Sequence, residues 1–244
     1  MSDPNPATPI PQRSTLTADY QRDWKEYYAA VAGMPPRDTL IRALDAFEAE
    51  DRGKASPVWR KALDIACGEG RDTREMLRRG GSTRWKVMAS DSTENAINLL
   101  SGSIGQRDQD RVFLARCAME ELPTRYPMPR FDQTERPVDG VDLANASFAL
   151  PFCIPSAFGR LWSWIESALK PGGRFAGQFF GDRDEWACVR PKSHFTKPQV
   201  EHLFRDWTIE HLEEVEKEGD DAMGNAKYHH VFHVVARRAE GRNA

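Results

Sequence analysis

A short apolar segment that ends in two closely spaced glycines constrains the fold of this chain more than any other feature. Residues 62–66 are apolar except for Asp64, and a Gly-Glu-Gly turn follows at 68–70. Such an apolar run is typical of a strand buried in a parallel sheet, and glycines let the backbone turn sharply and approach a ligand closely. Residues 71–79 then have the character of a short helix. A strand, a glycine turn and a helix N-terminus place free backbone N–H groups at the carboxyl edge of a sheet, which predicts a nucleotide-type site.

Two acidic residues limit which nucleotide ligands the predicted site can bind. Asp64 precedes the glycine turn, and Asp91 closes a second apolar run at 87–91. An acid at the end of the second strand, about 20 residues after the turn, is placed to bind both hydroxyls of an adenosine ribose. The loop has no third glycine at the dinucleotide position, so it makes little provision for a pyrophosphate. A ligand with a ribose and an amino-acid tail suits this loop better than NAD.

Four segments, in order, resemble the motifs of class I S-adenosylmethionine-dependent methyltransferases. Ala62–Asp72 is similar to the first motif of that family, Ser90-Asp91 to the second, Met119–Pro123 to the adenine-binding third, and Leu169–Arg174 to the turn before the fifth strand. The combination is specific for the superfamily, and it implies S-adenosyl-L-methionine as the cofactor. It does not specify a substrate.

Alternating strands and helices predict a doubly wound α/β sheet. The resemblance implies a Rossmann-like, seven-stranded sheet that is mostly parallel and has an antiparallel C-terminal strand. The seven predicted strands cover residues 60–66, 84–90, 112–117, 141–146, 174–180, 207–217 and 227–237. Predicted helices cover residues 19–31, 37–49, 70–80, 93–103 and 156–169, and a further helix begins after Thr196.

The N-terminal part divides into a tail and a helical segment. Residues 1–16 are rich in proline, serine and threonine and are expected to be disordered. Residues 17–55 carry two predicted helices, and the first presents three aromatic side chains on one face, Trp24, Tyr27 and Tyr28. This face either packs on the core as an ordinary amphipathic helix or closes as a lid over cofactor and substrate. Residues 56–240 form the predicted methyltransferase domain, which makes a single globular domain with the lid.

The resemblance assigns the cofactor contacts to particular residues of this chain. They are Asp64, Ala66, Cys67, Gly68, Gly70, Arg71, Asp91, Ser92, Met119, Glu120, Asn145 and Ser147. Asp64 and the backbone of the loop would hold the methionine tail, whose carboxylate Arg71 could pair with. Asp91 would bind the ribose diol. In the alternative interpretation, Asp64 only caps a turn.

The adenine and methyl ends of the cofactor are assigned less directly. Met119 offers an apolar contact to adenine, and Glu120 an acceptor for its amino group. Many relatives have an acid two residues before Glu120, where this chain has Ala118. If that acid reads adenine, the base is held here through backbone groups. Asn145 and Ser147 end the fourth strand beside the expected methyl group, although Ser147 could bond only to the backbone.

Methyl transfer from a sulfonium requires little chemistry from the protein, because the leaving group is already activated. Holding the nucleophile in line and excluding water supply much of the rate. A base is needed only when the acceptor must lose a proton, and the candidates are His194, His229 and His230. His194, after the fifth strand, is the preferred candidate, since histidines within a strand are more often sheet-face residues. No metal is expected, because these histidines lack partners at ligand spacing.

Composition limits the partners and the compartment. The 244 residues include 34 basic and 37 acidic side chains, so no basic excess indicates nucleic acid as a partner. The four cysteines have no CxxC spacing and are expected to be free thiols: Cys67, Cys117, Cys153 and Cys188. The chain begins without the features of a signal peptide and has no apolar run of the ~20 residues that cross a bilayer, so a cytoplasmic protein without a membrane partner is expected.

The acceptor is less constrained than the cofactor. Residues 177–186 and the C-terminal strands resemble small bacterial methyltransferases of the tellurite-resistance (TehB-like) type. This likeness, the acidic balance and the aromatic N-terminal helix favour a small-molecule acceptor. The fourth motif lacks Asn-Pro-Pro-Tyr, which argues against amino-methylation of DNA bases and of protein glutamine. Protein or RNA methylation, a Rossmann-like NAD oxidoreductase and a non-catalytic nucleotide-binding protein remain as alternatives, and the oligomeric state is open.

Overall fold

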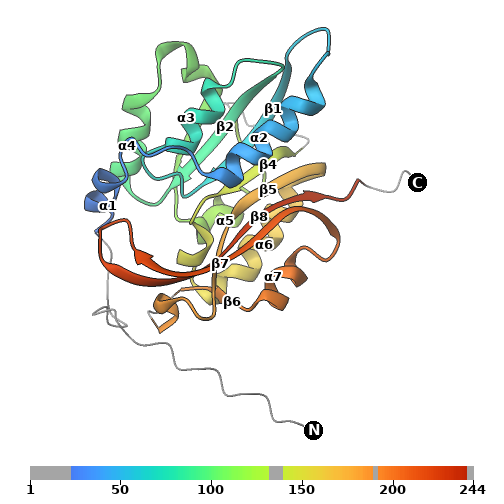
Figure 1. Ribbon diagram of the computed structural model, residues 1–244. Coiled ribbons are helices and arrows are strands. Elements are labelled where there is room, and N and C mark those ends of the chain that lie inside the picture. Colours follow the sequence, from blue (N-terminus) through green and yellow to red (C-terminus); the bar gives the residue numbers. More distant parts are fainter. Residues whose placement is uncertain (1–22, 132–139, 189–191, 241–244) are drawn as a thin grey trace.

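One central sheet organises the protein in a computed structural model that describes residues 23–131, 140–188 and 192–240 (Figure 1). Its strands follow the order β3-β2-β1-β4-β5-β8-β7. The strands are β1 (Val58–Ile65), β2 (Thr83–Asp91), β3 (Val112–Arg116), β4 (Val141–Ala146), β5 (Leu169–Gly181), β7 (Trp207–Asp220) and β8 (Ala226–Arg238). A two-residue strand, β6 (His194–Phe195), pairs with β5 outside this order.

The direction of the strands confirms the predicted fold class. Strands β1 to β5 run parallel to their neighbours, whereas β8 is antiparallel to both β5 and β7. The C-terminal halves of β1 and β2 are buried, and β4 is buried throughout. This burial agrees with the strands predicted from the sequence at 60–66, 84–90 and 141–146. The sheet is therefore Rossmann-like and mostly parallel, and its last strand is antiparallel.

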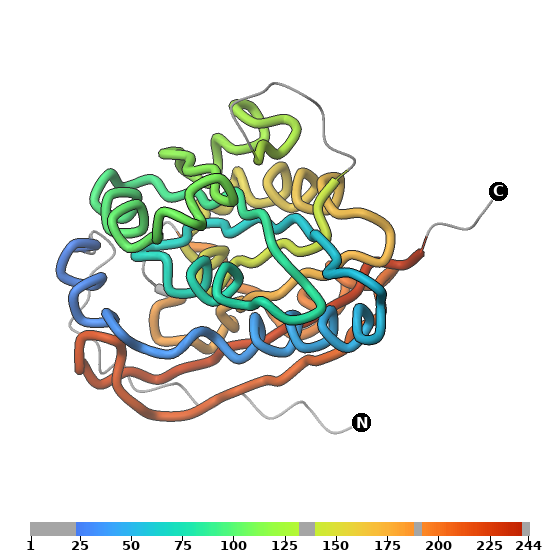
Figure 2. The backbone as a smooth tube through the Cα atoms, turned by 90° about the horizontal axis from the view of Figure 1, so that it is seen from above, coloured from blue at the N-terminus to red at the C-terminus, as the bar shows by residue number. Residues whose placement is uncertain are grey.

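Helices cover both faces of the sheet. They are α1 (Trp24–Ala30), α2 (Asp38–Asp51), α3 (Arg71–Arg78), α4 (Glu94–Ser103), α5 (Leu122–Arg125), α6 (Pro155–Ala168) and α7 (Lys197–Leu203). Apolar side chains of α2, α3 and α4 share one buried cluster with one face of the sheet, and those of α6 and α7 share a second cluster with the other face. Figure 2 shows α2 and α6 on opposite sides of the strands.

Two element boundaries differ from the sequence prediction. β5 begins at Leu169 rather than 174, because Leu169 pairs with Val141 ahead of a register shift in β4. α1 begins at Trp24, where the Asp23 carboxylate accepts from the N–H groups of Lys25 and Glu26 and caps the helix. The predicted start of that helix at residue 19 and the predicted tail at 1–16 lie outside the described residues.

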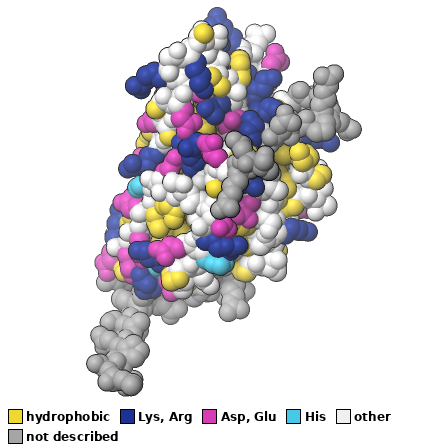
Figure 3. Space-filling view, turned by 90° about the vertical axis from the view of Figure 1, so that its right-hand side faces the viewer, with side chains coloured by type: hydrophobic (Ala, Val, Ile, Leu, Met, Phe, Trp, Pro, Cys, Tyr) yellow, Lys and Arg dark blue, Asp and Glu magenta, His cyan; other side chains and the backbone are white. Residues whose placement is uncertain are grey.

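The β7–β8 hairpin reaches the N-terminal helix. Figures 1 and 2 both show its tip beside α1. On the face drawn in Figure 3, basic and acidic side chains are interspersed among the coloured residues. Within the described residues, no helix is both long and apolar enough to cross a bilayer. Cys67, Cys117 and Cys153 are free thiols, and the side chain of Cys188 lies outside the described part.

Candidate active site

The loop between β1 and α3 is shaped by three residues with left-handed backbone conformations. Ala66, Gly68 and Gly70 have φ values of 52°, 57° and 87°. A Cβ on Gly70 would lie 2.3 Å from Cδ1 of Leu100, and one on Gly68 would lie 3.3 Å from the Tyr28 ring. Glycine is therefore required at position 70 by packing as well as by conformation. The turn brings the loop backbone to the carboxyl end of the sheet, as the sequence predicts.

A buried acidic pair lies beneath this loop. The Asp64 carboxylate accepts from the Thr73 hydroxyl and, at 2.9 Å, from the Asn145 amide, and the same amide donates to Asp72 at 3.2 Å. Asp72 also accepts from the backbone N–H of Arg37 at 3.1 Å. Burial, and then the neighbouring Asp72 carboxylate, raise the pKa of Asp64 to about 7. The pair therefore concentrates negative charge that a cation can relieve.

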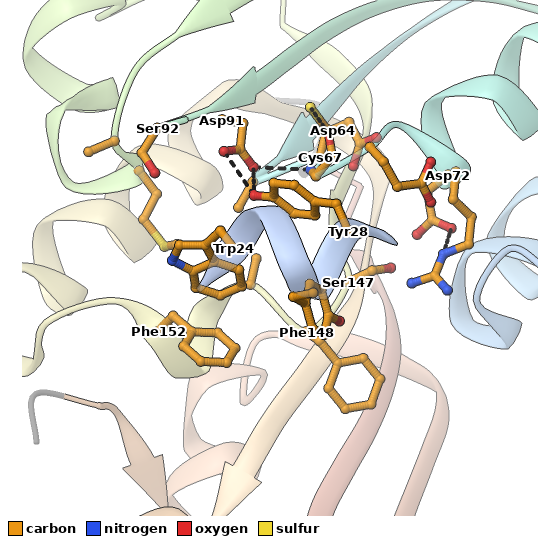
Figure 4. A pocket seen from close by; sticks show the side chains of 18 of the residues that line it. Trp24, Tyr28, Asp64, Cys67, Asp72, Asp91, Ser92, Ser147, Phe148 and Phe152 are labelled. Atoms are coloured by element: carbon orange, nitrogen blue, oxygen red, sulfur yellow. Dashed lines mark hydrogen bonds and ion pairs between the residues drawn. The ribbon is translucent and has the colours of Figure 1, made fainter. Parts of the chain in front are cut away.

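A second acid, Asp91 at the end of β2, is surrounded by donors. Its oxygens accept from the N–H groups of Gly68 at 3.0 Å and Thr93 at 2.9 Å, and from the Thr93 hydroxyl. The Tyr28 hydroxyl of α1 donates to both oxygens at 3.3 and 3.4 Å, as Figure 4 shows. The phenol thus makes the kind of contact with Asp91 that a ribose hydroxyl would make.

These groups line a cavity of about 280 Å³. It brings together ten of the twelve residues assigned to the cofactor from the sequence: Asp64, Ala66, Cys67, Gly68, Arg71, Asp91, Ser92, Met119, Glu120 and Ser147. Trp24, Tyr27 and Tyr28 of the predicted lid line it as well. Gly70 and Asn145 lie behind the wall, since Gly70 packs against Leu100 and Asn145 is fully buried beside Asp64.

At the adenine end of the predicted site, the two alternatives are recognition by the Glu120 side chain and recognition by backbone groups. Ala118, Met119 and Glu120 all line the cavity. One oxygen of Glu120 accepts from the backbone N–H of Ile154 at 3.1 Å, so part of its hydrogen-bonding capacity is used within the protein. The backbone carbonyls of Ala118, Met119 and Glu120 are also engaged, because they accept from the N–H groups of Glu121 and Leu122 and from the Arg160 side chain.

Several lining residues were not singled out from the sequence. They are Val31, Glu69, Asp72, Cys117, Phe148, Ala149 and Phe152. The position of Asp72 could have indicated a place in the site, because it lies in the first turn of the helix that follows the glycine loop. No feature of the nearby sequence indicates that Phe148 lines the cavity. Its φ of 51° is unusual for a bulky residue, and its N–H donates to the Gln178 side chain at 2.8 Å.

A second cavity, of about 540 Å³, adjoins the first. The two cavities share Tyr27, Phe148 and Phe152. The remaining walls of the second come from the start of α2, from β5 and residue 186, and from the β7–β8 hairpin. The hairpin therefore does more than complete the sheet, because it encloses space beside the first cavity.

The candidate bases differ in whether their side chains line a cavity. His229 and His233 of β8 line the second cavity, whereas His194 lies on β6 and lines neither cavity. His230 faces the opposite side of β8, where its ring contacts Glu214 at 3.0 Å and accepts from the N–H of Arg183 at 3.1 Å. Burial lowers the pKa of His194, His229 and His233. Of the three histidines considered from the sequence, only His229 borders a cavity.

Comparison with known proteins agrees with this arrangement. Residues 62–173 match the sequence family described as the methyltransferase domain. No curated protein sequence matches the chain. TehB from Haemophilus influenzae has the same fold with a TM-score of 0.63 at 16% identity, over 88% of this chain and 67% of that one.

Two structures with bound S-adenosylhomocysteine are also similar. The Burkholderia thailandensis 1,6-didemethyltoxoflavin-N1-methyltransferase, which also holds 1,6-didemethyltoxoflavin, has a TM-score of 0.54 and 22% identity over 83% of this chain and 79% of that one. The N-methyltransferase NodS from Bradyrhizobium japonicum WM9 has a TM-score of 0.52 and 14% identity over 89% of this chain and 98% of that one. A methyltransferase domain model therefore matches the part of the chain that supplies most of the lining of the first cavity, and solved structures with bound S-adenosylhomocysteine share the fold.

Proposed function

We propose that this protein transfers the methyl group of S-adenosylmethionine to a small-molecule acceptor held in the second cavity. The observation that carries the proposal is the direct adjacency of the two cavities through Tyr27, Phe148 and Phe152. Class I enzymes of similar fold include one whose structure holds a small heteroaromatic molecule beside S-adenosylhomocysteine. An acceptor chamber closed by the chain's own helices and hairpin suits a small molecule better than a protein or RNA segment.

The residues around the first cavity fit the cofactor. The acidic pair Asp64 and Asp72 is placed for the α-ammonium group, and Arg71 and the loop N–H groups are placed for the carboxylate. Asp91 receives the ribose hydroxyls once the Tyr28 phenol moves aside. When bound, the cofactor supplies an activated methyl group on a sulfonium.

The protein's contribution to the reaction is positioning and exclusion of water. The aromatic side chains Tyr27, Phe148 and Phe152 form the boundary that the acceptor atom must approach, and they leave few polar groups there to compete with it. For an acceptor that must lose a proton, His233 is the residue best placed to take it. Its ring lies 6.0 Å from that of Phe148, and burial keeps it neutral by lowering its pKa.

The test combines cofactor binding with the fate of the methyl group. Calorimetric titration with S-adenosylmethionine should give binding that Asp91→Ala weakens at least ~10-fold, a loss of about 1.4 kcal/mol. Methyl-labelled cofactor, incubated with the protein and an extract that holds both small molecules and macromolecules, should label the low-molecular-mass fraction. Label found only in protein or RNA would contradict a small-molecule acceptor, and absence of cofactor binding would contradict the whole proposal.

A further inference from the structure

Aromatic rings form one wall of the second cavity. Phe148, Phe152, Phe180 and Trp186 all line it, and neighbouring rings lie with their centroids 5.8–6.5 Å apart. Phe148 is fixed in place, because Gln178 accepts from its N–H and in turn donates to the Thr39 hydroxyl of α2. A continuous wall of fixed rings favours a flat, apolar ring system over a flexible polar ligand.

One cation at this wall lies over an aromatic ring. The guanidinium of Arg37 lies over the Phe148 ring, 4.4 Å from its centroid. Among the described residues Arg37 forms no ion pair; burial and the nearby Arg71 lower its pKa, and Tyr27, which hydrogen-bonds to its side chain, and Asp72 oppose them only in part. Asp72 is bonded to its backbone N–H, and the Arg37 Nε atom is buried without a hydrogen-bond partner. A buried N–H donor without a partner is unfavourable unless something else satisfies it.

Lys227, the other cation of the cavity that lies over aromatic rings, differs from Arg37 in its burial and its partners. Lys227 also lies over aromatic rings, 5.0 Å from the centroid of Phe180 and 4.5 Å from that of Trp186. Its Nζ lies 2.6 Å from the Asp184 carboxylate, and both side chains are almost fully buried. The charge of Lys227 is therefore balanced by a carboxylate in contact with it, whereas Arg37 has no carboxylate at ion-pair distance among the described residues.

The N-terminus of α2 adds to the positive potential at the same place. Arg37 is the N-cap residue of this 14-residue helix, and no side chain caps the first turn. Asp38 and Thr39 of that turn line the cavity together with Arg37. Uncapped N–H groups and the helix dipole favour an anion near this point.

The acidic residues around the cavity lie toward solvent. Asp38, Glu213 and Asp220 are exposed, and the Asp221 carboxylate accepts from the N–H groups of Met223 and Asn225. Exposed Arg42 and Lys217 lie on the same rim and offset them. The rim is thus mixed in charge, and the partly buried cation without an ion pair among the described residues is Arg37.

We propose that the second cavity binds an aromatic acceptor that carries an anionic group, with the ring against the Phe148–Trp186 wall and the anion on Arg37. This assignment rests on the proposed function, because that function makes the cavity the acceptor site. It adds a chemical class to the acceptor, and it makes Arg37 a specificity-determining residue.

Three probes that differ in one property each test the class. 2-Naphthoate is aromatic and anionic, 2-naphthamide has the same rings without the charge, and decahydro-2-naphthoate has the charge without the aromatic rings. Each is titrated calorimetrically into the protein saturated with S-adenosylhomocysteine. We expect 2-naphthoate to bind at least tenfold more tightly than either of the other two. Equal or tighter binding of 2-naphthamide, or no binding of any probe to the loaded protein, would overturn the proposal.

A matched pair of variants locates the anion. Arg37→Gln should weaken 2-naphthoate binding at least tenfold, and Arg52→Gln should leave it unchanged. Arg52 lies at the other end of α2, is exposed and lines neither cavity. Both variants should bind S-adenosylhomocysteine as the unaltered protein does, which shows that the fold and the cofactor site are intact. Unchanged 2-naphthoate binding by Arg37→Gln would refute the role of Arg37, whereas loss of S-adenosylhomocysteine binding by the unaltered protein would refute the proposed function instead.

Discussion

At the scale of single residues, Asp64 links the buried acidic pair to the charge of the ligand. Its carboxylate already accepts from Thr73 and Asn145 and lies beside Asp72. Burial and the Asp72 carboxylate raise its pKa to about 7, so the neutral form of Asp64 becomes favourable near neutral pH. An ammonium group bound there favours the ionised form.

Cofactor binding should therefore depend on pH in a defined direction. Below pH 7 the ligand must bind to a site whose Asp64 is protonated, so a proton must leave and the affinity falls. Between pH 8 and pH 6, Kd for S-adenosylhomocysteine should rise by about tenfold, since each pH unit below the pKa costs up to a factor of ten. Calorimetry at pH 6, 7 and 8 measures this. Asp64→Asn should bind more weakly with a flat profile, and a flat profile in the unaltered protein would refute the link.

At the scale of elements, α1 competes with the ligand for Asp91. Its Tyr28 ring covers Gly68, and its hydroxyl donates to Asp91 and contacts the Thr93 hydroxyl at 3.4 Å. Tyr28 is buried, and its pKa is raised above the usual value by burial and by the Asp91 charge, so it stays a donor. A ribose diol must displace this contact, so α1 must shift or its side chain must turn before the cofactor is fully seated.

Removal of the phenol hydroxyl tests this competition. Tyr28→Phe keeps the ring over Gly68 but removes the bond to Asp91, and Kd for S-adenosylmethionine should fall about fivefold, the equivalent of about 1 kcal/mol for one long hydrogen bond. Tyr27→Phe is the matched control, since Tyr27 is a neighbouring tyrosine that lines the same cavity, whereas the phenol bonded to Asp91 is that of Tyr28. Weaker binding by Tyr28→Phe would instead mean that the hydroxyl holds the cofactor.

The sequence predicts well those elements whose cause lies in neighbouring residues, such as an apolar run or a helix cap. The buried runs before Gly68 and at Asp91 become β1 and β2, and the Thr196–Gln199 capping box begins α7. The partner of Tyr28 is 63 residues away in sequence, so a helical face shows that the ring is buried but not what it contacts. The left-handed conformation of Phe148 is imposed by Gln178, 30 residues later, and has no local signature.

At the scale of the whole molecule, the β7–β8 hairpin sets the limit of sequence prediction. The sequence predicts the two strands, but β7 is largely polar and mostly exposed, and nothing in its local pattern indicates a cavity wall. The second cavity forms only when this hairpin, α2 and the aromatic residues after β4 and β5 meet. The residues that the motifs assign to the cofactor cluster at one sheet edge, whereas the second cavity depends on contacts between distant segments.

Ligand binding at this sheet edge should raise the Tm of the whole domain. A ligand that binds only the folded state at 100 times its Kd stabilises it by about 2.7 kcal/mol, which for a domain of this size raises Tm by roughly 5–10 °C. S-adenosylhomocysteine should give such a shift, NAD should give none, and Asp91→Ala should reduce the shift at the same ligand concentration. Thermal unfolding followed by circular dichroism measures all three. An equal shift with NAD would favour the dinucleotide alternative, because the two ligands share an adenosine and differ in what the loop at 66–70 must hold beyond the ribose.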